Sequence, residues 1–598
     1  MASCDMQPAD RKETEELTKV CRDVAERSSR ILGDFAQKQS QSLSAAVRDE
    51  MGIARAFMDL HARMATDPTL MASLSVNLWV DYMRLWQSSW MRMFGVHSQP
   101  VAEPAKGDSR FKDDDWSSNF LFDIVKQSYL IAARHIQHAV SSVAGLPGES
   151  EKKVAFFTRQ YVDALSPSNF LLTNPQVLRE TLASGGQNLV RGLNNLLADI
   201  EKGNGELRIS MTDESAFRLG HNVATTPGSV VYQNDLMQLI QYRPATQEVY
   251  KRPLVIVPPW INKYYILDLR EKNSFIRWAV ERGHTVFVVS WVNPDARLAG
   301  KGFDDYMLEG PLAALEAIER QTGERKVNII GYCLGGTLLG AALGYLANKK
   351  QDRVGSATFF VSLLDFSQPG ELGVFIDEEQ VANLERKMNE RGYLEGSEMA
   401  STFNLLRAND LVWSFVVNNY LLGKDPFPFD LLYWNADSTR MPARMHSFYL
   451  RNMYIRNLMG VPGGITLAGE PIDLSQVKLP AYFISTVEDH IAPWKTTYRG
   501  ARYLGGPVRF VLGGSGHIAG IVNPPAAKKY HYWTNDSLPA TPEEWFATAT
   551  QRPGSWWEDW QAWIDRQNAG EPKVEARKPR SPLEDAPGSY AMMRVVRP

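Results

Sequence analysis

The chain has 598 residues, which is long enough for two or more domains and a large core, and its 44% hydrophobic and 22% charged residues are ordinary globular usage. A formal net charge of −3, with no long basic stripe, argues against nucleic acid as a partner. The polar N-terminus and the absence of any run of about 18 apolar residues lead us to expect a protein that is neither secreted nor membrane-spanning.

The first third of the chain is expected to be helical. Apolar residues recur at helical spacing at Leu17, Val20, Cys21 and Val24, and few prolines interrupt residues 10–95. A stretch rich in Pro, Gly and charge at 98–115 is typical of a linker or exposed loop, and helical patterning resumes after it. We therefore predict a helical N-terminal domain over residues 1–205.

From about residue 207 the sequence pattern changes to short runs of β-branched residues that alternate with helical segments. This alternation indicates a largely parallel α/β sheet, so residues 206–598 are expected to form the catalytic domain. The alternation fails in an aromatic, Met- and Asn-rich stretch, which we interpret as an inserted cap at about 367–477. The expected core strands are 254–257, 285–290, 327–330, 357–363, 481–485 and 509–512.

A nucleophile elbow carrying cysteine is the most informative local motif. Cys333 stands between Gly331 and Gly335 at the junction of an apolar run and a helical one. In such an elbow a strand turns sharply into a helix, so the central side chain projects into a cleft while small neighbours relieve the crowded backbone. The other cysteines, Cys4 and Cys21, form no metal-like cluster with it, which fits a free thiol in a reducing cytoplasm and predicts no metal site.

Two later loops supply an acid and a base. Asp489 follows one late strand and His517 follows the last, so the chain order is nucleophile, acid, histidine, as in α/β-hydrolases. We expect His517 to take the thiol proton and Asp489 to orient and stabilise His517. The adjacent Glu488 is a competitor for the role of Asp489. The fold class predicted is thus an α/β-hydrolase core with an inserted cap and a mainly helical N-terminal domain.

An oxyanion hole should be formed by backbone amides. The N–H of Leu334, the residue after the nucleophile, is expected to supply one donor. The second should come from the loop after the first core strand, where we favour the amide of Ile261, with that of Trp260 as the next choice.

Cysteine in place of serine indicates the type of acyl transfer. An acyl group moved from a thioester to cysteine remains a thioester and a strong donor, whereas transfer to serine would give an ester. Such an intermediate suits delivery to an alcohol, so the residue favours a thioester-to-ester transferase over a hydrolase.

Several longer motifs resemble class I polyhydroxyalkanoate synthases, and the similarity covers nearly the whole chain. The elbow carries cysteine as it does in that family, although Trp260 stands where the family has a smaller residue. The other family-like segments are residues 166–170, 173–175, 258–269, 409–413, 433–437, 488–494 and 516–520.

The resemblance implies polymerisation of (R)-3-hydroxyacyl-CoA, with a short-chain substrate such as 3-hydroxybutyryl-CoA, release of CoA and formation of polyester granules. It implies that Cys333 holds the acyl group, that His517 activates the thiol, and that Asp489 activates the substrate 3-hydroxyl. That last role differs from the orienting role expected from chain order, and both stay open. No cofactor is implied.

The resemblance also implies a cytoplasmic homodimer at the granule surface, in contact with the growing polyester and granule-associated proteins. The N-terminal domain would help granule association, and a mobile cap would gate the site. Two alternatives remain: a cytoplasmic cysteine-dependent thioesterase or hydrolase, and an inactive granule-binding protein.

Overall fold

The computed structural model describes residues 52–594 and divides the chain into two compact units. One comprises Met1–Asp213 with Arg407–Phe427, and the other comprises Glu214–Leu406 with Pro428–Pro598. The sequence placed the domain boundary after residue 205 and all of 206–598 in the catalytic domain, whereas the structure groups 206–213 and 407–427 with the first unit. The expected helical repeat from Leu17 to Val24 lies outside the described residues.

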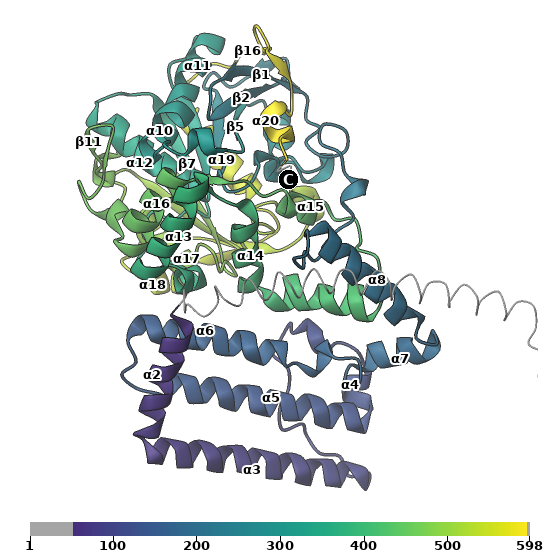
Figure 1. Ribbon diagram of the computed structural model, residues 1–598. Helices are drawn as coiled ribbons and strands as arrows, with labels where there is room; N and C mark the ends of the chain where they lie inside the picture. Colours follow the sequence, from purple (N-terminus) through teal and green to yellow (C-terminus); the bar gives the residue numbers. More distant parts are fainter. Residues whose placement is uncertain (1–51, 595–598) are drawn as a thin grey trace, which may run out of the picture. The chain divides into compact units, whose positions relative to one another are not determined.

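The first unit is helical, as predicted for this part of the chain. Helices α3, α5 and α6 lie side by side, and α2 packs against α3 and α6 (Figure 1). The side chain of Asp67 caps α3 by accepting the N–H of Leu70, with Pro68 at the first helical position. The principal helices are α2 (Ile53–Ala65), α3 (Pro68–Met93), α5 (Phe120–Ser141), α6 (Gly148–Ala164), α7 (Pro175–Ala183) and α8 (Gln187–Lys202).

Residues 407–427 join this unit because the helical segment η10 (Val416–Leu421) packs closely on α8. A Cβ atom at Gly192 would lie 1.9 Å from the carbonyl oxygen of Tyr420, so only glycine permits this approach. The side-chain amide of Asn188 donates to Leu421 O at 2.8 Å, and the Tyr420 hydroxyl donates to Asp199 at 2.5 Å.

The second unit is built on an 11-stranded sheet with the order β15-β14-β13-β12-β7-β6-β4-β5-β2-β1-β17. Its six central strands are parallel, which confirms the α/β fold class. Each of these strands coincides with an expected one, with ends that differ by three residues or fewer. They are β4 (Leu254–Val257), β5 (Val286–Trp291), β6 (Val327–Tyr332), β7 (Val354–Phe360), β12 (Ala481–Thr486) and β13 (Val508–Gly513).

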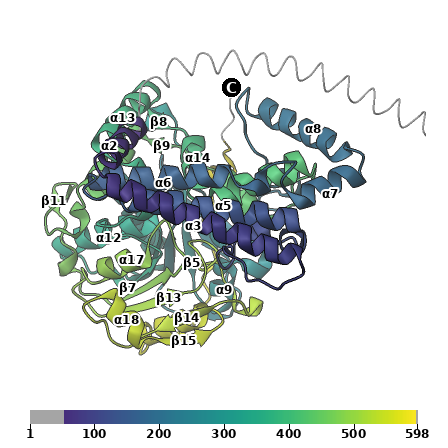
Figure 2. The same ribbon diagram turned by 90° about the horizontal axis from the view of Figure 1, so that it is seen from below.

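Both edges of the sheet are antiparallel, which the sequence did not predict. One edge carries β14 (His531–Thr534) and β15 (Thr550–Pro553), seen beside β13 in Figure 2. The other carries β2 (Met237–Tyr242), β1 (Gly228–Gln233) and β17 (Glu584–Asp585).

The strand order places the functional loops together. From β4 the chain moves first to β5 on one side and then to β6 on the other, so the order reverses at β4. In open α/β sheets the ligand cleft lies beyond the carboxyl ends of the strands at this switch point. The loop after β4 and the elbow after β6 are therefore neighbours.

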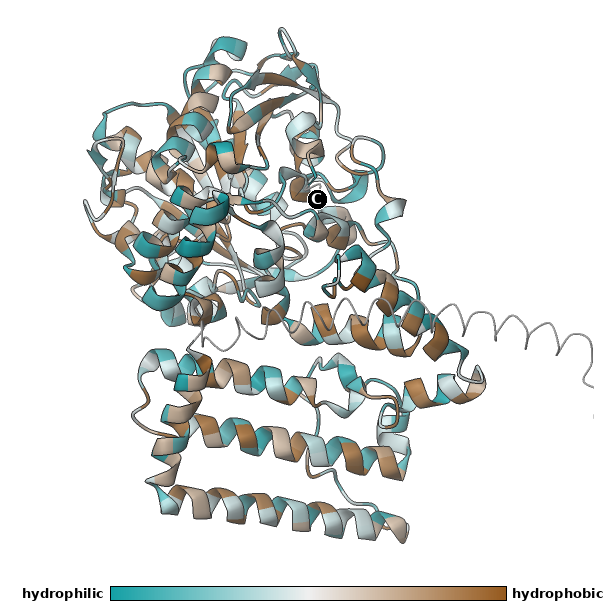
Figure 3. Cartoon of the chain, in the orientation of Figure 1, coloured by the Kyte–Doolittle hydropathy of each residue, from teal (hydrophilic) through white to brown (hydrophobic). Residues whose placement is uncertain are grey.

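Helix α12 (Leu334–Asn348) follows β6 and is buried along almost its whole length. Helix α19 (Trp557–Gln567) packs Trp557 and Trp560 into the same large core, whose apolar residues fill the strands of the sheet (Figure 3). Within residues 52–594, no helix combines the length and the apolar composition required to cross a bilayer.

Candidate active site

Cys333 occupies a sharp turn between β6 and α12. Its backbone has φ 52° and ψ −120°, a conformation that L-residues rarely adopt. The turn is held because the N–H of Cys333 donates to Phe360 O and its carbonyl accepts the N–H of Gly336, both at 2.9 Å. The residue is partly exposed in this arrangement.

The glycines of the elbow are required by close approach of neighbouring atoms. A Cβ at Gly336 would lie 1.9 Å from the Ser362 hydroxyl oxygen, and one at Gly331 would lie 2.5 Å from Cα of Gly336. A Cβ at Gly335 would lie 2.1 Å from the carbonyl oxygen of Val257, the last residue of β4, and 2.7 Å from that of Pro258 in the following loop. The elbow therefore packs directly on that loop.

Asp489 and His517 meet beyond the ends of β12 and β13. The Nδ1–H of His517 donates to Asp489 Oδ2 at 2.7 Å, and Asp489 Oδ1 accepts the amides of Ile491 and Ala492, each at 2.8 Å. The Asp489 side chain is fully buried, whereas Glu488 is exposed. The carboxylate that accepts the hydrogen bond of His517 is thus that of Asp489 and not that of Glu488.

The environment of His517 favours its charged form. Burial alone would lower the pKa of this imidazole, but attraction to Asp489 and to the Cys333 thiolate, with hydrogen bonds to both, outweighs burial and raises the pKa to about 10. The ring also stacks on Tyr332, with centroids 5.9 Å apart. The raised pKa favours the protonated imidazole at neutral pH.

Three tyrosines surround the thiol, and the sequence analysis assigned a role to none of them. Burial is the main cause that raises the pKa of Tyr332, Tyr449 and Tyr454, and the nearby charge of Cys333 contributes to all three shifts. Tyr449 ends α16 (Ala443–Tyr449) in the cap, and its ring centroid lies 5.5 Å from that of Tyr454. Tyr332 directly precedes Cys333, whereas no local pattern could have revealed Tyr449 and Tyr454, because more than a hundred residues separate them from the elbow.

The loop after β4 presents amides near the elbow. Trp291 Nε1 donates to Pro258 O at 2.8 Å, and the Thr439 hydroxyl donates to Trp260 O at 2.6 Å. Within residues 52–594, no hydrogen bond engages the N–H of Ile261 or that of Leu334. Neither of the two amides is therefore engaged in this part of the chain, and their role as oxyanion donors stays a prediction.

The side chain of Trp260 belongs to an aromatic cluster and is only 2% exposed. Its ring centroid lies 5.5 Å from Tyr306 and 6.0 Å from Tyr449. Large rings in this position supply apolar contact area beside the loop after β4.

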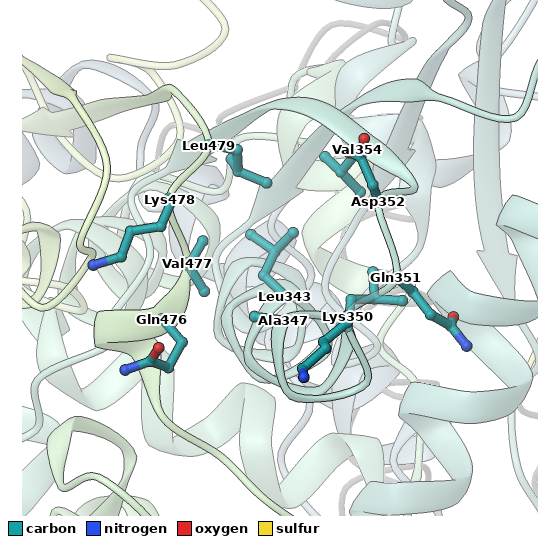
Figure 4. A pocket seen from close by; sticks show the side chains of 11 residues that line it. Leu343, Ala347, Lys350, Gln351, Asp352, Val354, Gln476, Val477, Lys478 and Leu479 are labelled. Atoms are coloured by element: carbon teal, nitrogen blue, oxygen red, sulfur yellow. The ribbon is translucent and has the colours of Figure 1, made fainter.

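One open cavity of about 310 Å³ lies away from the thiol (Figure 4). It is lined by Leu343, Ala347 and Lys350 near the end of α12 and by Gln476–Leu479, and Figure 4 shows these side chains around it. Leu343 is nine residues beyond Leu334, or about 14 Å along the helix axis. This cavity is therefore separate from the elbow.

Together, these residues can perform acyl transfer to a thiol. A thiol on a strained turn, an imidazole bonded to a buried carboxylate, and two backbone amides without a partner among the described residues are the groups that such a reaction requires as nucleophile, acid–base group and oxyanion donors.

Comparison with known proteins gives two family models and a set of relatives. Residues 107–279 match the model described as "Poly-beta-hydroxybutyrate polymerase (PhaC) N-terminus", and residues 270–524 match "alpha/beta hydrolase fold". A poly(3-hydroxyalkanoate) polymerase subunit PhaC of Rhizobium meliloti is 49% identical over 533 residues, covering 89% of this chain and 87% of the relative.

Two further relatives carry similar names. A poly(3-hydroxyalkanoate) polymerase of Methylorubrum extorquens is 49% identical over 534 residues, covering 88% of each chain. A poly(3-hydroxyalkanoate) polymerase subunit PhaC of Cupriavidus necator is 41% identical over 546 residues, covering 90% of this chain and 91% of the relative.

Proposed function

Because the chain belongs to the poly(3-hydroxyalkanoate) polymerase family, and is therefore an acyltransferase, we propose that it polymerises (R)-3-hydroxyacyl-CoA through a covalent thioester on Cys333. The single observation that supports this mechanism most is the buried pair of Asp489 and His517, with the thiol close enough to raise the pKa of His517.

In the first step the Cys333 thiolate attacks the thioester carbonyl of the substrate. The oxyanion that forms would accept the N–H groups of Leu334 and Ile261. When the tetrahedral intermediate collapses, the bond to the CoA sulfur breaks, His517 gives its proton to the departing thiolate, and the acyl group stays on Cys333.

In the second step the 3-hydroxyl of a hydroxyacyl chain attacks the acyl thioester. Neutral His517 accepts the hydroxyl proton, an ester bond forms, and the Cys333 thiolate is released. Exchange of a thioester for an ester is downhill, which supports synthesis over hydrolysis.

Asp489 acts in this scheme by orienting His517. One carboxylate oxygen accepts from His517 and the other accepts two backbone amides, and the side chain is fully buried. This satisfied environment supports the orienting role over direct deprotonation of the substrate.

The substrate class is short-chain, with 3-hydroxybutyryl-CoA as the representative. Large rings near the thiol support this assignment: the charge of Cys333 acts on Tyr449 and Tyr454, and Trp260 packs against Tyr449 with ring centroids 6.0 Å apart. No cofactor takes part in either step, since CoA is a leaving group of the substrate.

We place the protein at granules in the cytoplasm. Contact with granules is supported by one face of α3, the lowest helix of Figure 3, which mixes apolar and neutral residues. The apolar residues of this face are spaced three and four apart, so they share one side of the helix, and all are exposed. We name this set the α3 face: Val76, Trp79, Met83, Trp86, Trp90 and Met93.

Such an exposed apolar surface suits contact with a hydrophobic polymer or a granule-associated protein. We also propose that the protein forms a homodimer, as the family resemblance implies.

Purified protein incubated with 3-hydroxybutyryl-CoA tests the reaction. Release of CoA thiol together with solvent-extractable polymer is the expected result, and Cys333→Ala should abolish both while the protein stays folded. Release of free 3-hydroxybutyrate without polymer would overturn the synthase proposal in favour of a thioesterase. No release of CoA would favour a granule-binding protein without activity.

A further inference from the structure

We propose that Thr439 is a positioning residue that aims the amide of Ile261 at the reacting carbonyl. This inference rests on the proposed role of Ile261 as an oxyanion donor. The Thr439 side chain is 1% exposed, and its hydroxyl donates to Trp260 O at 2.6 Å.

The bond to Trp260 O fixes the direction of the next N–H group. The carbonyl of Trp260 and the N–H of Ile261 belong to one planar trans peptide, in which the two groups point in opposite directions. While Thr439 holds the carbonyl on one side, the Ile261 N–H must therefore point to the other side. That N–H has no partner within residues 52–594.

The loop has few alternative donors. Pro258 and Pro259 have no amide hydrogen, so the turn after β4 relies on Trp260 and Ile261 for N–H groups. The bond from Trp291 Nε1 to Pro258 O therefore braces the loop without aiming any donor. Of the two side-chain bonds to this loop, the one from the Thr439 hydroxyl fixes a peptide plane whose N–H has no partner in the described part of the chain.

Thr439 is itself held in a short antiparallel pairing with the loop. Its backbone N–H donates to Ile261 O at 3.3 Å, and Asn262 forms an antiparallel bridge with Ser438. These backbone contacts do not depend on the Thr439 side chain. Removal of the hydroxyl should thus loosen one peptide plane without detaching the segment.

A buried ion pair anchors the segment that carries Thr439. Lys263 Nζ lies 3.0 Å from Asp437, with side-chain exposures of 2% and 4%, and Trp434 Nε1 donates to Lys263 O at 2.7 Å. Lys263 also donates to the carbonyls of Ala591 and Met593, both at 2.7 Å, and the Tyr265 hydroxyl donates to Asp437. The hydroxyl of Thr439 is consequently presented from a rigid support.

The test compares Thr439→Val, which keeps the shape and loses the hydroxyl, with Thr439→Ser, which keeps the hydroxyl. We expect Thr439→Val to lower kcat for CoA release from 3-hydroxybutyryl-CoA by about 10- to 100-fold with KM within about twofold, because the oxyanion develops only in the transition state. Thr439→Ser should retain most of the wild-type kcat.

The second readout is the rate at which iodoacetamide alkylates Cys333. It is measured from the mass of the peptide that contains Cys333. This displacement forms no oxyanion, so Thr439→Val should alkylate at the wild-type rate. Equal losses of alkylation and CoA release would overturn the inference, because they would indicate general damage to the site. So would a wild-type kcat in Thr439→Val, or a serine variant as slow as the valine variant.

Two controls complete the design. If Thr439→Val is recovered unfolded, Thr439→Ala removes the hydroxyl with a smaller side chain. This variant must then show a lowered kcat and an unchanged rate of alkylation. Failure of the proposed function is recognised separately, since Cys333→Ala would then still release CoA whatever the Thr439 variants do.

Discussion

Replacement of Gly335 by alanine probes how closely the elbow and the oxyanion loop must fit. The new Cβ would lie 2.1 Å from Val257 O and 2.7 Å from Pro258 O, whereas ordinary contact begins at 3.4 Å, so backbone must move by about 1 Å. Both are backbone oxygens where β4 passes into the loop that carries Ile261, and neither is the end of a flexible side chain. A misplacement of this size costs about 100-fold in rate.

The matched control is Gly340→Ala in the same helix. Its Cβ would meet only the side-chain ends of Leu364 and Met459, at 2.6 and 3.1 Å, which can shift by rotation. We expect kcat for CoA release to fall about 100-fold in Gly335→Ala and to stay within about threefold of wild type in Gly340→Ala.

Initial rates of CoA thiol release measure the effect, and circular dichroism confirms that each variant is folded. A folded Gly335→Ala protein with a wild-type kcat would refute the reasoning, because it would show that the loop can move without loss of the oxyanion hole. Equal losses in both variants would refute it too, since they would point to damage in α12 itself.

Three further outcomes are expected. Asp489→Asn should lower the pKa of His517 by removing its main attractive partner, and so slow alkylation of Cys333 at pH 7; an unchanged rate would contradict the ion-pair account. The pKa of His517 rises from 6.5 to about 10 on folding, so its charge stabilises the fold fully below pH 6.5 and this stability is lost as pH rises through 10. The difference in Tm between wild type and His517→Gln should therefore shrink from pH 6.5 to pH 10, and a constant difference would argue against it. Replacing Trp79, Trp86 and Trp90 on the α3 face by serine should reduce co-sedimentation with polyester particles at an unchanged initial rate of CoA release; undiminished sedimentation would remove the α3 face from granule binding.

The sequence predicted the parts of the fold that depend on local pattern. Six parallel strands were expected from β-branched runs, and the loops after four of them, β4, β6, β12 and β13, carry the candidate site residues. The order of these loops along the chain was enough to pair Asp489 with His517. The antiparallel edge strands were missed because their short runs lack the alternation with helices that marks a parallel sheet.

Contacts between distant segments could not be predicted in this way. Thr439 and Tyr454 stand in an aromatic stretch without periodicity, and their importance follows only from proximity to Trp260 and Cys333. Similarly, the fit between Gly192 and Tyr420 places 407–427 in the first unit although the sequence predicted one continuous cap.

The division of the chain into interleaved units has a consequence for how it folds during synthesis. The first unit needs residues 407–427, which are made only after the elbow, β7 and the first part of the cap. Until then the surface of α8 around Gly192 and Asn188 has no partner from this segment, so an emerging chain exposes it for the time needed to make two hundred residues or more. Domains that fold one after another on the ribosome avoid such an interval. Here the first unit can be completed only after residue 427 has been made, when a large part of the second unit has already been synthesised.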